Sequence, residues 1–151
     1  MGAKTGAFRV ALERSVLANF ARSVGDASPE YRAADAPAPP TFMFAAPYWA
    51  AFTEDQPPDP TKGGGNAMHK LMGDLYAQGA LVLHGEQEFE YHRTPIAGEV
   101  LDGEQTITDV YEKETDIARM TFVVMETVWR DARDGSPVVT ERFNLIARIR
   151  K

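Results

Sequence analysis

The sequence predicts an α+β fold in which helices come first and an antiparallel sheet with one apolar face follows. Apolar residues recur with a helical period over 12–24 and again over 66–79. A short and almost wholly apolar segment, Phe42–Phe52, lies between these two stretches. From Leu81 onward the apolar period changes to two, as in half-buried strands. The simplest arrangement wraps the sheet around the Phe42–Phe52 helix.

The first half of the chain contains the predicted helices. A short strand at Phe8–Ala11 is followed by an amphipathic helix over Leu12–Val24, which Gly25 ends. Thr41 is a candidate N-cap for the apolar helix, and an all-apolar helix is usually buried. Pro47 should kink or shorten that helix.

The segment Glu54–Gly65 is the clearest loop, because it holds three prolines and three consecutive glycines. Its composition offers few core contacts, so we expect it to be mobile when no ligand is bound. Asn66 then caps a second amphipathic helix that ends at Gly79.

The second half predicts four sequential strands, which we expect to form an antiparallel meander. The strands cover Leu81–Tyr91, Gln105–Glu112, Ile117–Arg130 and Val139–Ile149, and Asp134-Gly135 marks a hairpin turn. In the third strand one face carries Ala118, Met120, Phe122, Val124 and Val128 and is expected to face the core. The opposite face, with Val123, Met125 and Trp129, is too apolar for a solvated surface, which predicts a sheet-to-sheet contact that makes a dimer.

Composition excludes several classes of protein. The 151 residues suit one domain, and with no cysteine there is no disulfide, thiolate zinc site or cysteine nucleophile. Three histidines make a histidine metal cage improbable, and we expect no metal and no cofactor. The net charge of −6 argues against a nucleic-acid partner. The longest apolar stretch is too short to span a bilayer and the start resembles no signal peptide, so a cytoplasmic location is expected.

Most catalytic motifs are absent. The glycines at 63–65 lack the context of a phosphate-binding loop, and no HExxH or GxSxG motif occurs. Glu86, Glu88 and Glu90 resemble paired carboxylates, but a period of two places them on one strand face, where solvated acids are expected.

The stretch Phe20–Asp35 reads FARSVGDASPEYRAAD. It resembles the signature of the MaoC-like hot-dog family, which comprises (R)-specific enoyl-thioester hydratases and 3-hydroxyacyl-thioester dehydratases. The family pattern is G-D-x-N-P-aliphatic-H after an aromatic residue. Gly25, Asp26 and Pro29 match, whereas the pattern is broken at Ser28, Glu30 and Tyr31, the last of which stands at the histidine position.

The resemblance extends over nearly the whole chain, and implies that residues 1–151 form one hot-dog domain. The segment APPTFMFAAPYW is similar to the family's buried central helix, and Arg93–Gly98 to its RP-x-x-x-G turn. The chain looks most like the N-terminal, substrate-accommodating half of such dehydratases. The resemblance therefore implies an acyl-CoA or acyl-carrier-protein thioester as ligand and a catalytic MaoC-like hot-dog chain, or a second copy, as partner.

The family's chemistry explains why the histidine matters. An aspartate and a histidine share the water in one loop, and backbone N–H groups at the start of the central helix stabilise the thioester oxygen. By resemblance, Asp26 is the candidate catalytic residue, and Tyr31, Thr41, Phe42, His84 and Gly85 are candidate substrate-binding residues. Tyrosine is a poor base at neutral pH, because its reference pKa is near 10.

Simpler roles stand beside these. Asp26 can merely cap its turn, Tyr31 can be a packing residue, and His84 can be structural, while His69 and His92 are expected to face solvent.

Two functions of different classes remain open, with a third behind them. The first is a substrate-accommodating subunit of a hydro-lyase complex with little chemistry of its own, as Tyr31 favours. The second is a self-sufficient homodimeric hydratase or dehydratase that uses Asp26 with another group such as His84. The third is a thioesterase of the same fold. The sequence leaves the acyl chain open, and also whether coenzyme A or a carrier protein presents it.

Overall fold

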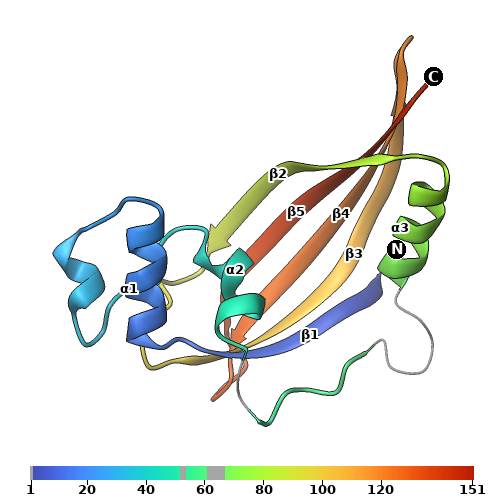
Figure 1. Ribbon diagram of the computed structural model, residues 1–151. Helices are drawn as coiled ribbons and strands as arrows, with labels where there is room; N and C mark the ends of the chain where they lie inside the picture. The colour runs from blue at the N-terminus through green and yellow to red at the C-terminus, as the bar shows by residue number, and fades with distance from the viewer. Residues whose placement is uncertain (1, 52–53, 61–66) are drawn as a thin grey trace.

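The computed structural model describes residues 2–51, 54–60 and 67–151. Along the chain, one strand and four short helical elements precede four long strands (Figure 1). The elements are β1 (Ala3–Ala11), α1 (Arg14–Ser23), the 3₁₀ helix η1 (Pro29–Arg32), α2 (Phe42–Trp49), α3 (Ala67–Ala77), β2 (Leu81–Tyr91), β3 (Val100–Glu114), β4 (Ala118–Asp131) and β5 (Pro137–Arg150).

The five strands form one antiparallel sheet in the order β1-β3-β4-β5-β2. The predicted meander is therefore wrong in part: β3, β4 and β5 follow one another, but β2 pairs with β5 at the far edge. The connection from β2 to β3 crosses the sheet's end, where the N–H groups of His92 and Arg93 donate to Val138 O. These bonds hold the connection beside β5. The chain therefore passes the ends of β5 and then β4 before it enters β3.

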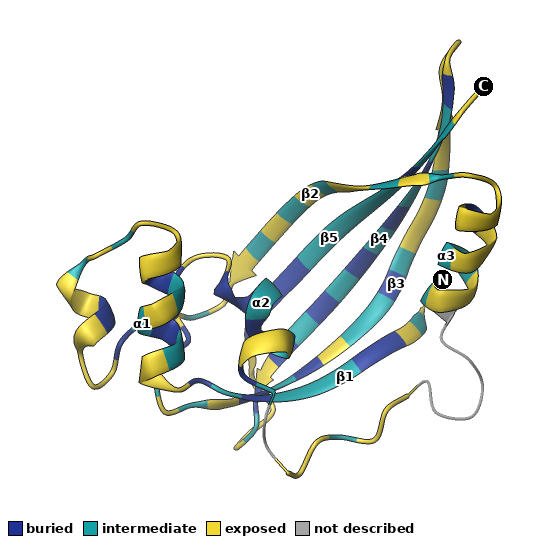
Figure 2. Ribbon diagram, in the orientation of Figure 1, coloured by how far each residue is buried: buried dark blue, intermediate teal, exposed yellow. Residues whose placement is uncertain are grey.

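Helix α2 lies against the concave face of the sheet, and this confirms the predicted arrangement of a sheet wrapped around the apolar helix (Figure 1). Phe42, Met43 and Ala46 are fully buried, and they pack in one cluster with Trp129 and Val139. Figure 2 shows the buried residues gathered where the sheet faces α2, while much of β2 is exposed. The helix ends at Trp49, three residues earlier than predicted, with Pro47 in its last turn.

The predicted faces of β4 are reversed. Val123 and Trp129 are fully buried and Met125 nearly so, because they face the helices rather than a second sheet. Val123 and Met125 belong to a second buried cluster, against which Met68 and Leu71 of α3 pack. Of the face expected to be the core, Ala118 is buried, but Met120, Phe122, Val124 and Val128 are half-exposed on the outer face. The sequence basis for a dimer through Val123, Met125 and Trp129 is thereby removed.

Part of the predicted mobile loop Glu54–Gly65 contacts strand β1. Asp55 forms an ion pair of 2.6 Å with Arg9, and the Gln56 side chain bonds both the N–H and the C=O of Arg9. Residues 61–65 of the loop lie outside the described residues, and its mobility stays a prediction. Among the residues that the structure describes, no helix is long and apolar enough to cross a membrane.

Candidate functional site

Asp26 follows α1 and Gly25, whose φ of +84° suits glycine and turns the chain away from the helix. One carboxylate oxygen of Asp26 accepts two hydrogen bonds, from Ser28 N at 2.9 Å and from Ser28 Oγ at 2.5 Å. These bonds stabilise the charged form and hold the pKa of Asp26 below its ordinary value. The arrangement is that of a carboxylate that caps its own turn.

Tyr31 lies in η1, five residues beyond Asp26, and only 6% of it is exposed. Burial is the main reason that the pKa of Tyr31 is raised above 10, and the nearby charges of Asp26 and Glu30 add to the effect. Its hydroxyl in turn lowers the pKa of Asp26. At neutral pH the pair is thus a charged, weakly basic carboxylate beside a protonated phenol.

Thr41 and Phe42 lie at the start of α2, where Thr41 adopts a left-handed conformation with φ of +69°. Their amides already have acceptors: Thr41 N donates to the Tyr91 hydroxyl at 3.3 Å, and Phe42 N to Pro39 O at 3.0 Å. A thioester oxygen would have to displace these acceptors to use either amide. The Phe42 side chain is fully buried in the core.

His84 and Gly85 lie on β2 and face different neighbours from Asp26. The His84 ring packs 4.5 Å from Phe143 and 5.5 Å from Phe44, measured between ring centroids. Gly85 lies within an irregularity of the β2–β5 ladder, where a Cβ would come within 2.8 Å of Asn144 O. Figure 1 shows η1 on the far side of α1 from α2 and β2. Asp26 and Tyr31 therefore lie apart from His84 and Gly85.

A cavity of about 150 Å³ between α2 and the sheet was not predicted. Its sheet side carries three polar residues, Gln105, Thr127 and Glu141, beside the ring of Trp129. Glu141 is 4% exposed, and burial raises its pKa to about 7. The sequence held one signal for it, because the period of two that aligns Val139 with Phe143 places an acid, Glu141, on the same apolar face.

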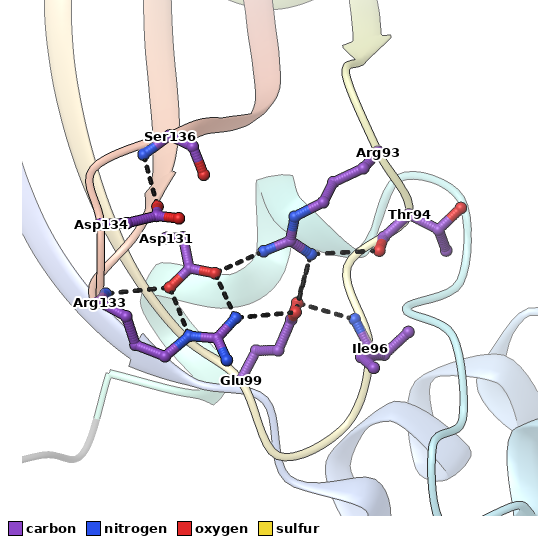
Figure 3. Close-up of polar contacts among 8 residues, drawn as sticks. All are labelled: Arg93, Thr94, Ile96, Glu99, Asp131, Arg133, Asp134 and Ser136. Atoms are coloured by element: carbon purple, nitrogen blue, oxygen red, sulfur yellow. Dashed lines mark hydrogen bonds and ion pairs between the residues drawn. The ribbon is translucent and has the colours of Figure 1, made fainter.

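The Arg93–Gly98 turn is fixed by an ion-pair network at one end of the sheet (Figure 3). Arg93 binds Glu99 at 2.8 Å and the buried Asp131 at 2.8 Å, and Arg133 binds Asp131 at 2.6 Å. The hydrogen bonds from Arg133 are the main reason that the pKa of Asp131 is far below its ordinary value. These ion pairs thus hold the Arg93–Gly98 turn, in the β2–β3 connection, against the β4–β5 hairpin.

The two remaining histidines, His69 and His92, are exposed as predicted, and so are Glu86, Glu88 and Glu90 on β2. In the part of the chain that the structure describes, no three acids or histidines come together as a metal site would need.

Comparison with known proteins shows that most of the chain matches one protein family. The family model described as "FAS1-like, dehydratase domain region" matches residues 1–141. A Streptomyces griseus protein named "UPF0336 protein" is 33% identical over 153 residues, which cover 95% of this chain and 87% of the relative.

Two solved complexes from Mycobacterium tuberculosis show the same fold. A chain of the ChsH1-ChsH2 complex is 21% identical with a TM-score of 0.69, and the match covers 95% of this chain and 83% of that one. A chain of the HadBC (3R-hydroxyacyl-ACP dehydratase) complex is 16% identical with a TM-score of 0.60, over 97% and 99% of the two chains. A further neighbour is titled "MaoC-like dehydratase", with a TM-score of 0.64 at 18% identity over 95% of this chain and 41% of that one. The predicted α+β hot-dog fold is confirmed.

Proposed function

Because the chain belongs to the family described as FAS1-like, dehydratase domain region, we propose that it is the substrate-accommodating subunit of a heteromeric (R)-specific enoyl-thioester hydratase or 3-hydroxyacyl-thioester dehydratase. Its partner in this proposal is a catalytic MaoC-like hot-dog chain that supplies the proton-transfer groups. This chain supplies walls of the acyl pocket and stability. The thioester reaches the complex on coenzyme A or on a carrier protein.

The observation that carries the proposal is the state of Asp26 and Tyr31. Hydration of an enoyl thioester needs a group that takes a proton from water and returns one to the α-carbon. Asp26 is a weak base because Ser28 already stabilises its charge, and Tyr31 holds its proton at neutral pH because it is buried. Neither group has a pKa near 7, where general acid–base catalysis works best.

Structural neighbours support a partnered role. The chain resembles components of two complexes, ChsH1-ChsH2 and HadBC, and the second is described as a 3R-hydroxyacyl-ACP dehydratase. The alternative of a self-sufficient homodimer requires Asp26 to work with another group. His84, the candidate for that group, packs against Phe44 and Phe143. It lies on β2, which is on the other side of α1 from η1 (Figure 1), so a second chain would have to bring Asp26 and His84 together.

Turnover of a 2-enoyl thioester tests the proposal. We expect the isolated chain to be about 10²–10⁴-fold slower than its complex with the catalytic chain that co-purifies with it, since the acid–base contribution is missing. Asp26→Asn should change the rate of the complex less than about twofold, because removing a weak base removes little catalysis.

Two variants of Tyr31 provide the controls. Tyr31→Phe should leave the rate of the complex unchanged, and Tyr31→His restores the residue type with a pKa near 7 and should give the isolated chain at most a small gain. Robust turnover by the isolated wild-type chain that collapses in Asp26→Asn would contradict the proposal and favour the homodimeric enzyme. Thioester hydrolysis without hydration would favour the thioesterase.

A further inference from the structure

The cavity beneath α2 combines apolar walls with a polar floor. On the helix side Met43, Phe44 and Pro47 line it, and on the sheet side Gln105, Thr127 and Glu141 do so. Its volume of about 150 Å³ is close to that of an engineered cavity that accepts benzene. A group of about six heavy atoms therefore fits inside it.

The polar floor is a row of facing residues across three strands. Gln105 on β3 lies opposite Thr127 on β4, which lies opposite Glu141 on β5. At one end of the row, the Thr5 hydroxyl donates to Gln105 Oε1 at 2.9 Å, and Gln105 Nε2 donates to Thr127 Oγ1 at 3.4 Å. Hydrogen bonds therefore hold the row in place from Thr5 as far as Thr127.

At the other end, few polar contacts compensate for the burial of the Glu141 carboxyl. Within the described part of the chain, its one hydrogen bond comes from Trp129 Nε1 at the long distance of 3.4 Å, and it takes part in no ion pair. Burying a carboxyl without partners is costly, and a leucine of similar volume would avoid that cost. The carboxyl has room for further hydrogen bonds on the side of the cavity.

A second buried polar group on the same face also lacks full hydrogen bonding. Gln87 on β2 is opposite Phe143, two residue pairs along the ladder from Phe89 and Glu141. Its amide nitrogen is buried and has no hydrogen-bond partner among the described residues. The concave face thus holds a buried donor without a partner, which lies outside the cavity lining, and within that lining a carboxyl with one long hydrogen bond. A bound oxygen-containing group would complete the hydrogen bonding of this carboxyl.

We propose that this cavity binds a hydroxyl- or carbonyl-bearing segment of an acyl chain, with Glu141 as the residue that selects for the oxygen. The assignment to an acyl chain rests on the function proposed above, whereas the selection for oxygen rests on the cavity alone. A purely hydrocarbon segment would leave Glu141 buried with only its long hydrogen bond from Trp129 among the described residues. A hydroxyl or carbonyl oxygen accepts a hydrogen bond from the neutral carboxyl, and a hydroxyl can also donate one to the carboxylate.

Binding of small matched probes to the isolated chain tests the selection for oxygen. Phenol and toluene have nearly the same shape, and they differ in a hydroxyl against a methyl group. The two tryptophans, Trp49 and Trp129, give two indole N–H signals, so the Trp129 signal reports directly on the cavity. We expect phenol to shift this signal with at least about tenfold tighter binding than toluene, because toluene adds no hydrogen bond to the buried Glu141 carboxyl.

Variants of Glu141 decide whether this carboxyl is responsible. Glu141→Leu should abolish the preference for phenol, and Glu141→Gln, which keeps a polar group of the same size, should retain part of it. Equal binding of the two probes to the wild type, or a preference that survives in Glu141→Leu, would overturn the proposal. Tighter binding of cyclohexylammonium than of phenol would also overturn it, since the site would then be a cation site.

The acyl assignment has its own test in the complex with the catalytic chain. Phenol should raise KM for a 2-enoyl thioester without lowering kcat, and Glu141→Leu should remove this effect. Phenol that binds the cavity but leaves KM unchanged would overturn the assignment to the acyl chain. A complex that is no faster than this chain alone would instead contradict the proposed function and leave the probe result intact.

Discussion

Glu141 is an acid that the fold holds under a helix, and this changes how its proton is bound. Burial raises its pKa from the ordinary 4.5 to about 7. The folded chain therefore binds this proton more tightly than the unfolded chain does. The resulting stabilisation is complete below about pH 4.5 and is lost as the pH rises through about 7.

The measurable consequence is a pH-dependent difference between the wild type and Glu141→Gln. Glutamine cannot titrate, so the variant lacks the loss between pH 4.5 and 8. At about 1.4 kcal/mol per pKa unit, its free energy of unfolding should rise relative to the wild type by up to about 3 kcal/mol over that range. Urea denaturation of both proteins at several pH values measures this difference. The contributions of other acids with shifted pKa values, such as Asp131, are the same in both proteins and cancel. Parallel pH profiles would show that Glu141 titrates normally.

The site residues show where sequence reasoning succeeds and where it ends. The substitution of tyrosine for histidine at position 31 was visible in the motif, and so was the weak basicity that follows from it. The sequence did not show that Asp26 and Tyr31 lie apart from His84, because this separation depends on how α1 packs beside α2. Glu141 was overlooked although its alternation with Val139 and Phe143 places it on the apolar face, because that pattern does not show that a helix covers this part of the face.

At the scale of elements, β4 is the strand that the sequence describes least well. Both of its faces are apolar, so a period of two cannot say which one faces the helices. Only the packing of α2 and α3 decides it, and it selects the face with Trp129. The order of the strands was hidden for a similar reason, since β2 and β3 are neighbours in sequence and the ion pairs of Arg93 hold their connection across the sheet's end.

The packing of Trp129 depends on a glycine in the neighbouring strand. Gly103 lies opposite Trp129, and a Cβ at position 103 would come within 2.5 Å of the indole ring. We expect Gly103→Ala to displace Trp129 from its place beside Phe8 and to cost about 1–3 kcal/mol of folding stability. Thermal or urea unfolding measures the loss, and the Trp129 indole signal reports the displacement.

Gly73 provides the matched control for Gly103→Ala. It lies in α3, and a Cβ there would meet no atom within 4 Å. Gly73→Ala should therefore raise stability by about 0.5–1 kcal/mol, because alanine favours a helix. If Gly103→Ala were as stable as the wild type, the close approach of β3 to the indole ring would not constrain the sheet.

At the scale of the whole molecule, the two edges of the sheet differ. The Gln56 side chain bonds the N–H and C=O of Arg9 on the β1 edge, and Asp55 pairs with the Arg9 guanidinium. The β2 edge has no such covering among the described residues, and Leu81, Leu83 and Tyr91 are 58%, 40% and 41% exposed. An open edge strand of 11 residues is a template for pairing with another strand.

The prediction for the whole molecule is therefore assembly through β2, either with itself or preferably with a catalytic hot-dog chain. Backbone pairing at that edge would extend the sheet and cover the exposed leucines. We expect the double variant Leu81→Glu, Leu83→Glu to weaken association at least about tenfold, because it places two charges in an apolar contact. Sedimentation measures the association, and hydrogen exchange should show new protection of β2 amides on assembly, with β1 unchanged.

Ile117→Glu is the matched control for this assembly, because Ile117 is 69% exposed and lies in the β3–β4 connection rather than on β2. It should leave association as it is in the wild type. A chain that stays monomeric at micromolar concentration, and whose β2 amides gain no protection when the catalytic chain is added, would contradict pairing at this edge. Protection confined to the outer face around Phe122 and Val124 would instead place the contact on the apolar surface that β4 turns away from α2.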